Sequence, residues 1–109
     1  MNFGQAIATC LGKYATFSGR ASRPEFWWFT LFQLILGLAT SMLSETANAL
    51  AGLALLLPAL AVGARRLHDI GRSGWWQLLY LTGIGFFLLL YWLVQPSSDG
   101  SNDYGALPA

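Results

Sequence analysis

Three long apolar runs, separated by short polar stretches, dominate the hydrophobic pattern of this 109-residue chain. They cover residues 26–43, 49–64 and 75–94, and none of them contains an Asp, Glu, Lys or Arg. A helix of about 20 apolar residues crosses the hydrocarbon core of a bilayer, which is about 30 Å thick. We therefore predict an all-α membrane protein with a single domain, 1–109, and one transmembrane helix over each run.

The segment before the first run has the periodicity of an amphipathic helix. We predict that residues 2–17 form such a helix and that it lies in the membrane interface, because it is too short and too polar to span. Asn2 can cap its start, and Gln5 three residues later completes a capping box. Its apolar face would carry Phe3, Ile7, Cys10, Leu11 and Tyr14.

Two further positions bear on the spanning helices. Ser22 is the predicted N-cap of the first one, with Glu25 in the capping-box position. Pro58 lies inside the second run and leaves the Ala54 carbonyl without its usual helical donor, so a neighbouring group must satisfy that oxygen. Residues 95–109, rich in Ser, Gly, Asp and Pro, have no periodicity and form a polar tail.

The distribution of charge indicates an orientation in the membrane. The chain is 55% hydrophobic and 10% charged, whereas a soluble domain is about 25% charged. Cationic loops are retained in the cytoplasm, so we expect the N-terminus and the loop 65–74 to be cytoplasmic. Three spans would then place the tail on the opposite side. The six basic residues are Lys13, Arg20, Arg23, Arg65, Arg66 and Arg72.

The densest group of functional side chains lies in residues 65–76. Together with the residues around Arg20 it could gather several guanidinium groups at one interface, where they would bind a phosphate or an anionic lipid headgroup. The alternative is structural: Glu25 would pair with Arg65 or Arg66 and lock the first spanning helix to the second. Arg65 and Asp69, one helical turn apart, could also pair.

The sequence offers little support for catalysis, and we expect no metal and no cofactor. His68 is the single histidine, and a site built from His68, Asp69 and Ser73 would lack a supporting nucleophile motif. Cys10 is the single cysteine and reads as a small buried apolar residue. The net charge of +1 argues against a nucleic-acid partner.

Three motifs resemble the DUF805 family of small bacterial inner-membrane proteins. Residues 19–27 resemble its GRxxRxEFW segment, although Pro24 stands where a basic or polar residue is expected. Residues 64–76 resemble RRLHDxxRSGWW, and residues 100–108 resemble GxNxYGxxP. The resemblance implies a bacterial cytoplasmic-membrane location and brings no assigned activity. It singles out Arg20, Arg23, Glu25, Arg65, Arg66, His68, Asp69, Arg72, Ser73, Trp75, Trp76, Asn102, Tyr104 and Gly105.

Two functions follow as hypotheses. The first is a non-enzymatic module that forms a homo-oligomer, assembles with a membrane-protein partner, or binds an anionic ligand or lipid through the cytoplasmic arginines. The second is a subunit of a small-solute or ion transporter or channel, suggested by Pro58, Gly83 and Gly85. If the tail motif is to meet the arginines, the run 75–94 must re-enter the membrane rather than cross it. Its 20 uncharged residues favour crossing.

Overall fold

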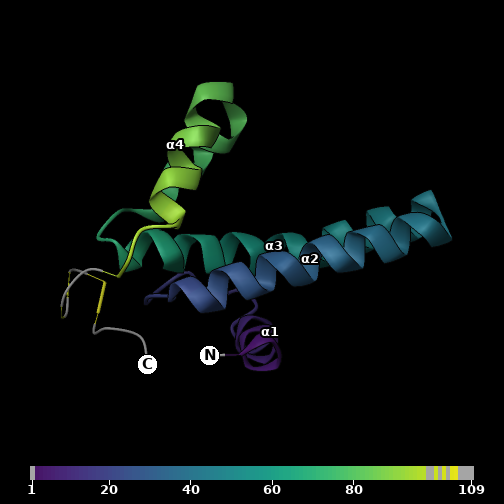
Figure 1. Cartoon of the computed structure of the whole chain (residues 1–109), viewed down its shortest axis with the longest axis horizontal. Helices are drawn as coiled ribbons and strands as arrows, with labels where there is room; N and C mark the ends of the chain where they lie inside the picture. Colours follow the sequence, from purple (N-terminus) through teal and green to yellow (C-terminus); the bar gives the residue numbers. More distant parts are fainter. Residues whose placement is uncertain (1, 98–99, 101, 103, 106–109) are drawn as a thin grey trace.

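The computed structural model describes residues 2–97, 100, 102, 104 and 105, and their regular structure is helical apart from a single bridge between Asn102 and Gly105. The expected all-α fold is therefore confirmed for this part of the chain. Figure 1 shows two long helices side by side, with the remaining helices gathered towards one end of the pair. The elements are α1 (Phe3–Gly12), α2 (Arg23–Leu43), α3 (Glu45–Asp69), the 3-10 helix η1 (Gly74–Leu81) and α4 (Gly83–Leu93).

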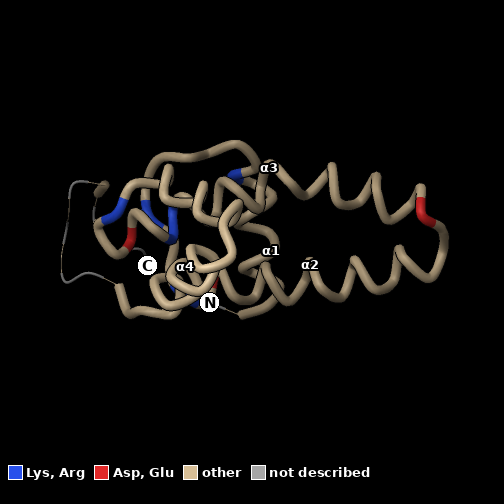
Figure 2. The backbone as a smooth tube through the Cα atoms, turned by 90° about the horizontal axis from the view of Figure 1, so that it is seen from above, with Lys and Arg blue, Asp and Glu red and all other residues tan. Residues whose placement is uncertain are grey.

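The helices α2 and α3 form an antiparallel hairpin that runs the length of the molecule (Figures 1 and 2). Ser44 joins them: its backbone N–H closes α2 on Thr40, and its side chain accepts from the Ala47 N–H at 3.0 Å to start α3. Both helices are long and apolar enough to cross a membrane. The second one continues beyond 64 to Asp69 and so carries the charged motif on its last turn.

The carbonyl that Pro58 leaves without a helical donor has a hydrogen-bond donor outside α3. Pro58 is buried within α3, and the helix continues through it. The Tyr14 hydroxyl donates to the Ala54 carbonyl that the proline leaves without a donor. The expectation that a neighbouring group satisfies this oxygen is confirmed.

The first helix begins as predicted and ends earlier. Asn2 and Gln5 form both bonds of the capping box, at 3.0 and 2.8 Å. The helix ends at Gly12 instead of continuing to residue 17. It crosses the α2–α3 pair and is seen nearly end-on in Figure 1. The Phe3 ring meets the Trp28 ring edge-to-face at 5.7 Å between centroids, so α1 packs on α2.

The prediction of one continuous helix over 75–94 is wrong. The run divides into η1 and α4, with Thr82 between them. The Thr82 side chain accepts from the Gly85 N–H at 3.0 Å and starts α4. A Cβ on Gly85 would lie 2.1 Å from Thr82 Oγ1 and 2.9 Å from the Leu79 carbonyl oxygen, so only glycine allows this close reversal.

The two pieces form an arm that leaves α3 and returns to it. η1 packs on both α3 and α4, and in Figure 1 the arm projects away from the long hairpin. At its start, a Cβ on Gly74 would lie 2.7 Å from the Ala64 Cβ. At its end, the Leu93 carbonyl accepts from Arg66 Nε at 3.2 Å. The chain therefore enters and leaves the arm beside the same end of α3.

The buried core lies where α1 and the arm meet the hairpin. Beyond that core, α2 and α3 cover only each other and leave large apolar side chains exposed: Leu38 is 70% exposed and Met42 is 86% exposed. Water does not tolerate a continuous apolar surface of this kind, whereas a bilayer does. The core cluster comprises Cys10, Ala21, Phe26, Phe29, Val62, Leu67, Leu89, Trp92 and Leu93.

The returning arm predicts the membrane sidedness of three positions. In a Cys10→Ser background, Ser73→Cys and Pro96→Cys should be labelled from the same side of the membrane by an impermeant maleimide. Thr46→Cys, in the first turn of α3 at the far end of the hairpin, should be labelled from the opposite side. Labelling of Pro96→Cys together with Thr46→Cys would show that the run 75–94 crosses the bilayer after all.

Candidate functional site

The charged side chains are segregated along the molecule. Figure 2 shows that the Lys and Arg positions lie in the half of the molecule away from the α2–α3 turn. Glu45 begins α3 at that turn. The first turn of α2, the last turn of α3 and the polar segments near them converge in this half. The candidate site is this charged end of the helix pair.

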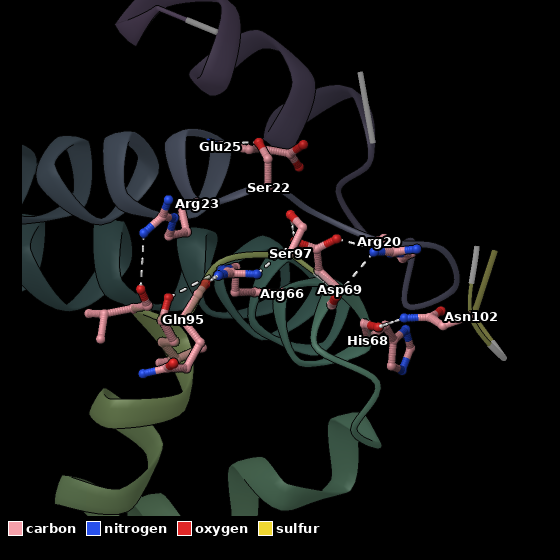
Figure 3. A network of polar contacts seen from close by, with 12 residues as sticks. Arg20, Ser22, Arg23, Glu25, Arg66, His68, Asp69, Gln95, Ser97 and Asn102 are labelled. Carbon is pink, nitrogen blue, oxygen red and sulfur yellow. Dashed lines mark hydrogen bonds and ion pairs between the residues drawn. The ribbon is translucent and has the colours of Figure 1, made fainter. Parts of the chain in front are cut away.

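Asp69 is the centre of the larger of two ion-pair groups (Figure 3). Arg20 Nε donates to Asp69 Oδ1 at 2.9 Å, and Arg66 Nη1 donates to Oδ2 at 2.8 Å. The Ser97 hydroxyl also donates to Oδ2. The side chains of Asp69 and Arg66 have no exposed surface, and that of Arg20 is 1% exposed. One buried carboxylate therefore ties α3 to the loop before α2 and to the tail.

Glu25 forms the second ion pair, and its partner is Arg65. This contact joins α2 to α3 and confirms the structural alternative that the sequence suggested. The pairing of Arg65 with Asp69 was wrong, because Asp69 is occupied by Arg20 and Arg66. Arg65 Nε and Nη2 are buried and have no hydrogen-bond partner among the described residues.

Cys10 lies against the same ion pair. Its sulfur is 3.9 Å from both the Glu25 carboxylate and the Glu25 carbonyl oxygen. Burial, followed by the negative charge of Glu25, raises the pKa of Cys10 to about 12. The thiol is therefore protonated and inert at physiological pH, in agreement with its interpretation as a buried apolar residue.

Arginine side chains also cap the end of α4. Arg66 donates to the carbonyls of Leu93, at 3.2 Å, and Gln95, while Arg23 Nη1 donates to Val94 at 3.3 Å. The last carbonyls of a helix lack internal partners and carry partial negative charge. The guanidinium groups satisfy both needs and hold the arm in its returned position.

The tail motif lies on the arginine motif, not across the membrane from it. The Tyr104 ring stacks on the His68 ring with 4.0 Å between centroids and 1° between planes. Asn102 Nδ2 donates to the His68 carbonyl at 2.9 Å, and Arg20 Nη1 donates to the Gly105 carbonyl at 3.1 Å. The expectation of a tail on the opposite side assumed a spanning third helix, and the returning arm removes that assumption.

The remaining candidates are exposed or half-buried. Arg72 places its guanidinium carbon 4.1 Å above the Trp92 ring, and Trp76 meets the same ring edge-to-face at 5.3 Å. Trp75 is 79% exposed. Ser73 accepts from the Trp75 N–H at 3.3 Å and caps η1. Residues 72–76 thus present a cation and two aromatic rings at the molecular surface.

The geometry does not assemble a catalytic triad from His68, Asp69 and Ser73. His68 Nδ1 bonds to the Gly19 carbonyl at 2.8 Å, whereas the Asp69 carboxylate faces Arg20, Arg66 and Ser97. Within the described residues, no three His, Cys, Asp or Glu side chains gather where they could hold a metal ion. The arrangement is that of a structural network.

Sequence reasoning missed several members of this network. The acceptors at Leu93, Val94 and Gln95 are backbone oxygens, which no side-chain pattern reveals. Trp27 also donates to the Leu93 carbonyl, at 3.1 Å. Among these members, Ser97 has a detectable signal, because its hydroxyl lies three residues beyond the last apolar run.

Comparison with known proteins agrees with this description. The family model for a protein of unknown function, DUF805, matches residues 14–106. The inner membrane protein YhaI of Escherichia coli K12 is 44% identical over 95% of this chain and 95% of its own. YhaH from the same strain is 37% identical over 90% and 91%. No solved structure matches. The chain is a relative of inner membrane proteins and belongs to the DUF805 family.

Proposed function

We propose that this protein is a non-enzymatic assembly module of the inner membrane, in which the α2–α3 hairpin crosses the bilayer and associates with a second copy. The proposal rests on a single observation, the environment of the Gln33 side chain. It lies half-buried in a groove of about 210 Å³ between α2 and α3. It forms no hydrogen bond with any residue that the structure describes.

An unpaired amide is unfavourable in hydrocarbon, and hydrogen bonds between membrane helices relieve it. Gln33 has both donors and an acceptor, so two copies can bond to each other through this one residue. Gly37 and Gly52 line the same groove and would let a second helix approach closely. The exposed leucines on both sides of the hairpin supply the lipid-facing or partner-facing surface.

The proposed orientation follows from the charged end. With Lys13 and the arginines on the cytoplasmic side, the N-terminus is cytoplasmic and α1 lies at that interface. The hairpin makes two crossings, and the η1–α4 arm remains associated with the cytoplasmic leaflet. This arrangement replaces a third crossing by an apolar element that enters and leaves on one side.

Binding of anionic lipid headgroups is a second candidate, and it rests on Arg23 and Arg72. Both residues are exposed and contact the last turn of α4 or the backbone next to it. Exposed guanidinium groups beside interfacial tryptophans suit phosphate headgroups. The buried arginines, by contrast, are paired with acids and carbonyls, which supports a structural role for them.

A transporter or channel subunit requires more than one chain in this geometry. Two crossing helices cannot enclose a pathway, so any conduction would depend on the same association. Self-association is therefore the property to test first.

The Gln33 side chain should contribute to self-association. Gln33→Leu should weaken the dimer by about 1 kcal/mol, roughly fivefold, as measured by energy transfer between labelled copies in liposomes. Ser41→Ala is the matched control on the same helix, because the Ser41 hydroxyl bonds only to the Leu38 carbonyl of its own helix. Equal association of wild type and Gln33→Leu would refute the interface.

The exposed cations should retain anionic lipid. Arg23→Gln combined with Arg72→Gln should lower the amount of phosphatidylglycerol and cardiolipin that copurifies in mild detergent, quantified by mass spectrometry. Lys13→Gln, an exposed cation at the end of α1, is the control for net charge. If the double variant and the control lose the same amount of lipid, the contact is unspecific.

The buried carboxylate should be essential for stability. Asp69→Asn removes the charge that faces two buried arginines and should lower the free energy of unfolding by about 3–5 kcal/mol, seen as earlier thermal unfolding in detergent. Glu45→Gln, exposed at the far end of the hairpin, should change it by less than about 0.5 kcal/mol. Equal unfolding temperatures of the two variants would contradict a stabilising role for the ion-pair network.

A further inference from the structure

A cavity of about 680 Å³ lies between α3 and η1. Its volume falls in the range of sites that hold small organic ligands, about 300–1,000 Å³. The cavity is partly open to the surroundings. Most of its wall is apolar, and the wall includes Leu60, Ala64, His68, Ser73, Leu78 and Leu81.

Two glycines allow the arm to pack closely on α3 next to the cavity. A Cβ on Gly74 would lie 2.7 Å from the Ala64 Cβ, and a Cβ on Gly63 would lie 2.2 Å from Gln77 Oε1. Gln77 in turn donates to the Leu60 carbonyl at 3.0 Å. The arm therefore packs closely on α3 at Gly63 and Gly74. The cavity is the open space next to these contacts.

The cavity has two polar groups at one end and a mainly apolar body, in which Gln77 and Tyr80 are the polar members of the wall. His68 is in the last turn of α3 and Ser73 caps η1, so both lie where the arm joins the charged end of the molecule. Leu60 lies two turns back along α3, and Leu81 ends η1. No Arg or Lys is among the described residues that line the cavity. This polarity suits a ligand with a small hydrogen-bonding head and a long apolar body.

His68 presents an available nitrogen at the polar end. The carbonyl of Gly19 can only accept, so His68 Nδ1, 2.8 Å away, carries the hydrogen. Nε2 is on the opposite side of the ring, 3.6 Å from the position that a Cβ on Gly74 would take. Within the described part of the chain Nε2 has no hydrogen-bond partner. The Tyr104 ring stacked on the imidazole fixes its orientation.

Ser73 supplies a second polar group. Its oxygen accepts from the Trp75 N–H at 3.3 Å, which leaves the hydroxyl hydrogen free to donate. A carboxyl group has two oxygens: one can share a proton with His68 Nε2, and the other can accept from Ser73. A phosphate headgroup would lack a cation in this lining, and an alcohol would have to reach both protein groups from a single oxygen.

We propose that the α3–η1 cavity binds a long-chain fatty acid, with its carboxyl group at His68 and Ser73 and its chain along Leu60, Leu78 and Leu81. The site does not depend on association through Gln33 or on the cations Arg23 and Arg72. The proposed site gives the η1–α4 arm a role beyond packing. A third helix that crossed the membrane would not fold back to form this cavity with α3.

The test uses a 16-carbon fatty acid with a photoreactive diazirine near the end of its chain, added to the full-length protein in nanodiscs. Mass spectrometry should locate the crosslinks on α3 and η1. Each CH₂ displaced from an apolar site weakens binding roughly fourfold. Leu60→Trp, which places a ring in the open cavity, should therefore lower labelling by about tenfold or more.

The control variant is Leu53→Trp, seven residues earlier on the same helix and 69% exposed, against 36% for Leu60. It should label like the wild type. The methyl ester of the same probe, which lacks the carboxyl group, should label the cavity less than the acid. Equal labelling of Leu60→Trp and wild type, or equal labelling by a phosphatidylglycerol that carries the same diazirine chain, would overturn the proposal and leave only bulk lipid.

Discussion

The structure depends on two carboxylates, Glu25 and Asp69, buried among three arginines at one end of a helix hairpin. A charge is removed from water only where opposite charge and hydrogen bonds replace its hydration. Asp69 meets this condition through Arg20, Arg66 and Ser97. The result is a network that specifies one arrangement of the chain, since each partner comes from a different segment.

The same network decides the path of the last apolar run. Arg66 bonds to Asp69 through one nitrogen and to the carbonyls beyond α4 through the others. A carbonyl at a helix end in an apolar environment needs such a donor. Because Arg66 is fixed on α3, the end of α4 must come to it, and the run 75–94 folds back. An apolar pattern alone would equally allow a crossing helix, so the polar contacts decide between two membrane-compatible paths.

The sequence was sufficient for the parts of the fold that local chemistry sets. The capping box at Asn2, the N-cap at Ser22 and the need for a donor at Ala54 all follow from short-range rules, and the structure contains each of them. The pairing of Glu25 with an arginine of α3 was also foreseeable, because both lie at helix ends on the same side. The reversal near Gly83 and Gly85 was an alternative that the sequence left open, since a glycine in an apolar run fits a bend and a close helix contact equally well.

The sequence predicted which residues form the site but not how they are arranged. Some residues that were expected to bind a ligand have a structural role instead. Clustered arginines usually indicate an anion site, yet here Arg65 is buried against Glu25, and Arg66 is buried against Asp69 and the Leu93 carbonyl. What remains for ligands lies beside the network: Arg23 and Arg72 at the surface, and the His68 nitrogen that faces the apolar cavity. Burial separates these groups, because a buried side chain is closed to an external ligand. Exposure is a property that sequence spacing does not give. The charged residues therefore act mainly as structural contacts. They hold the η1–α4 arm against α3, where the two elements enclose the cavity.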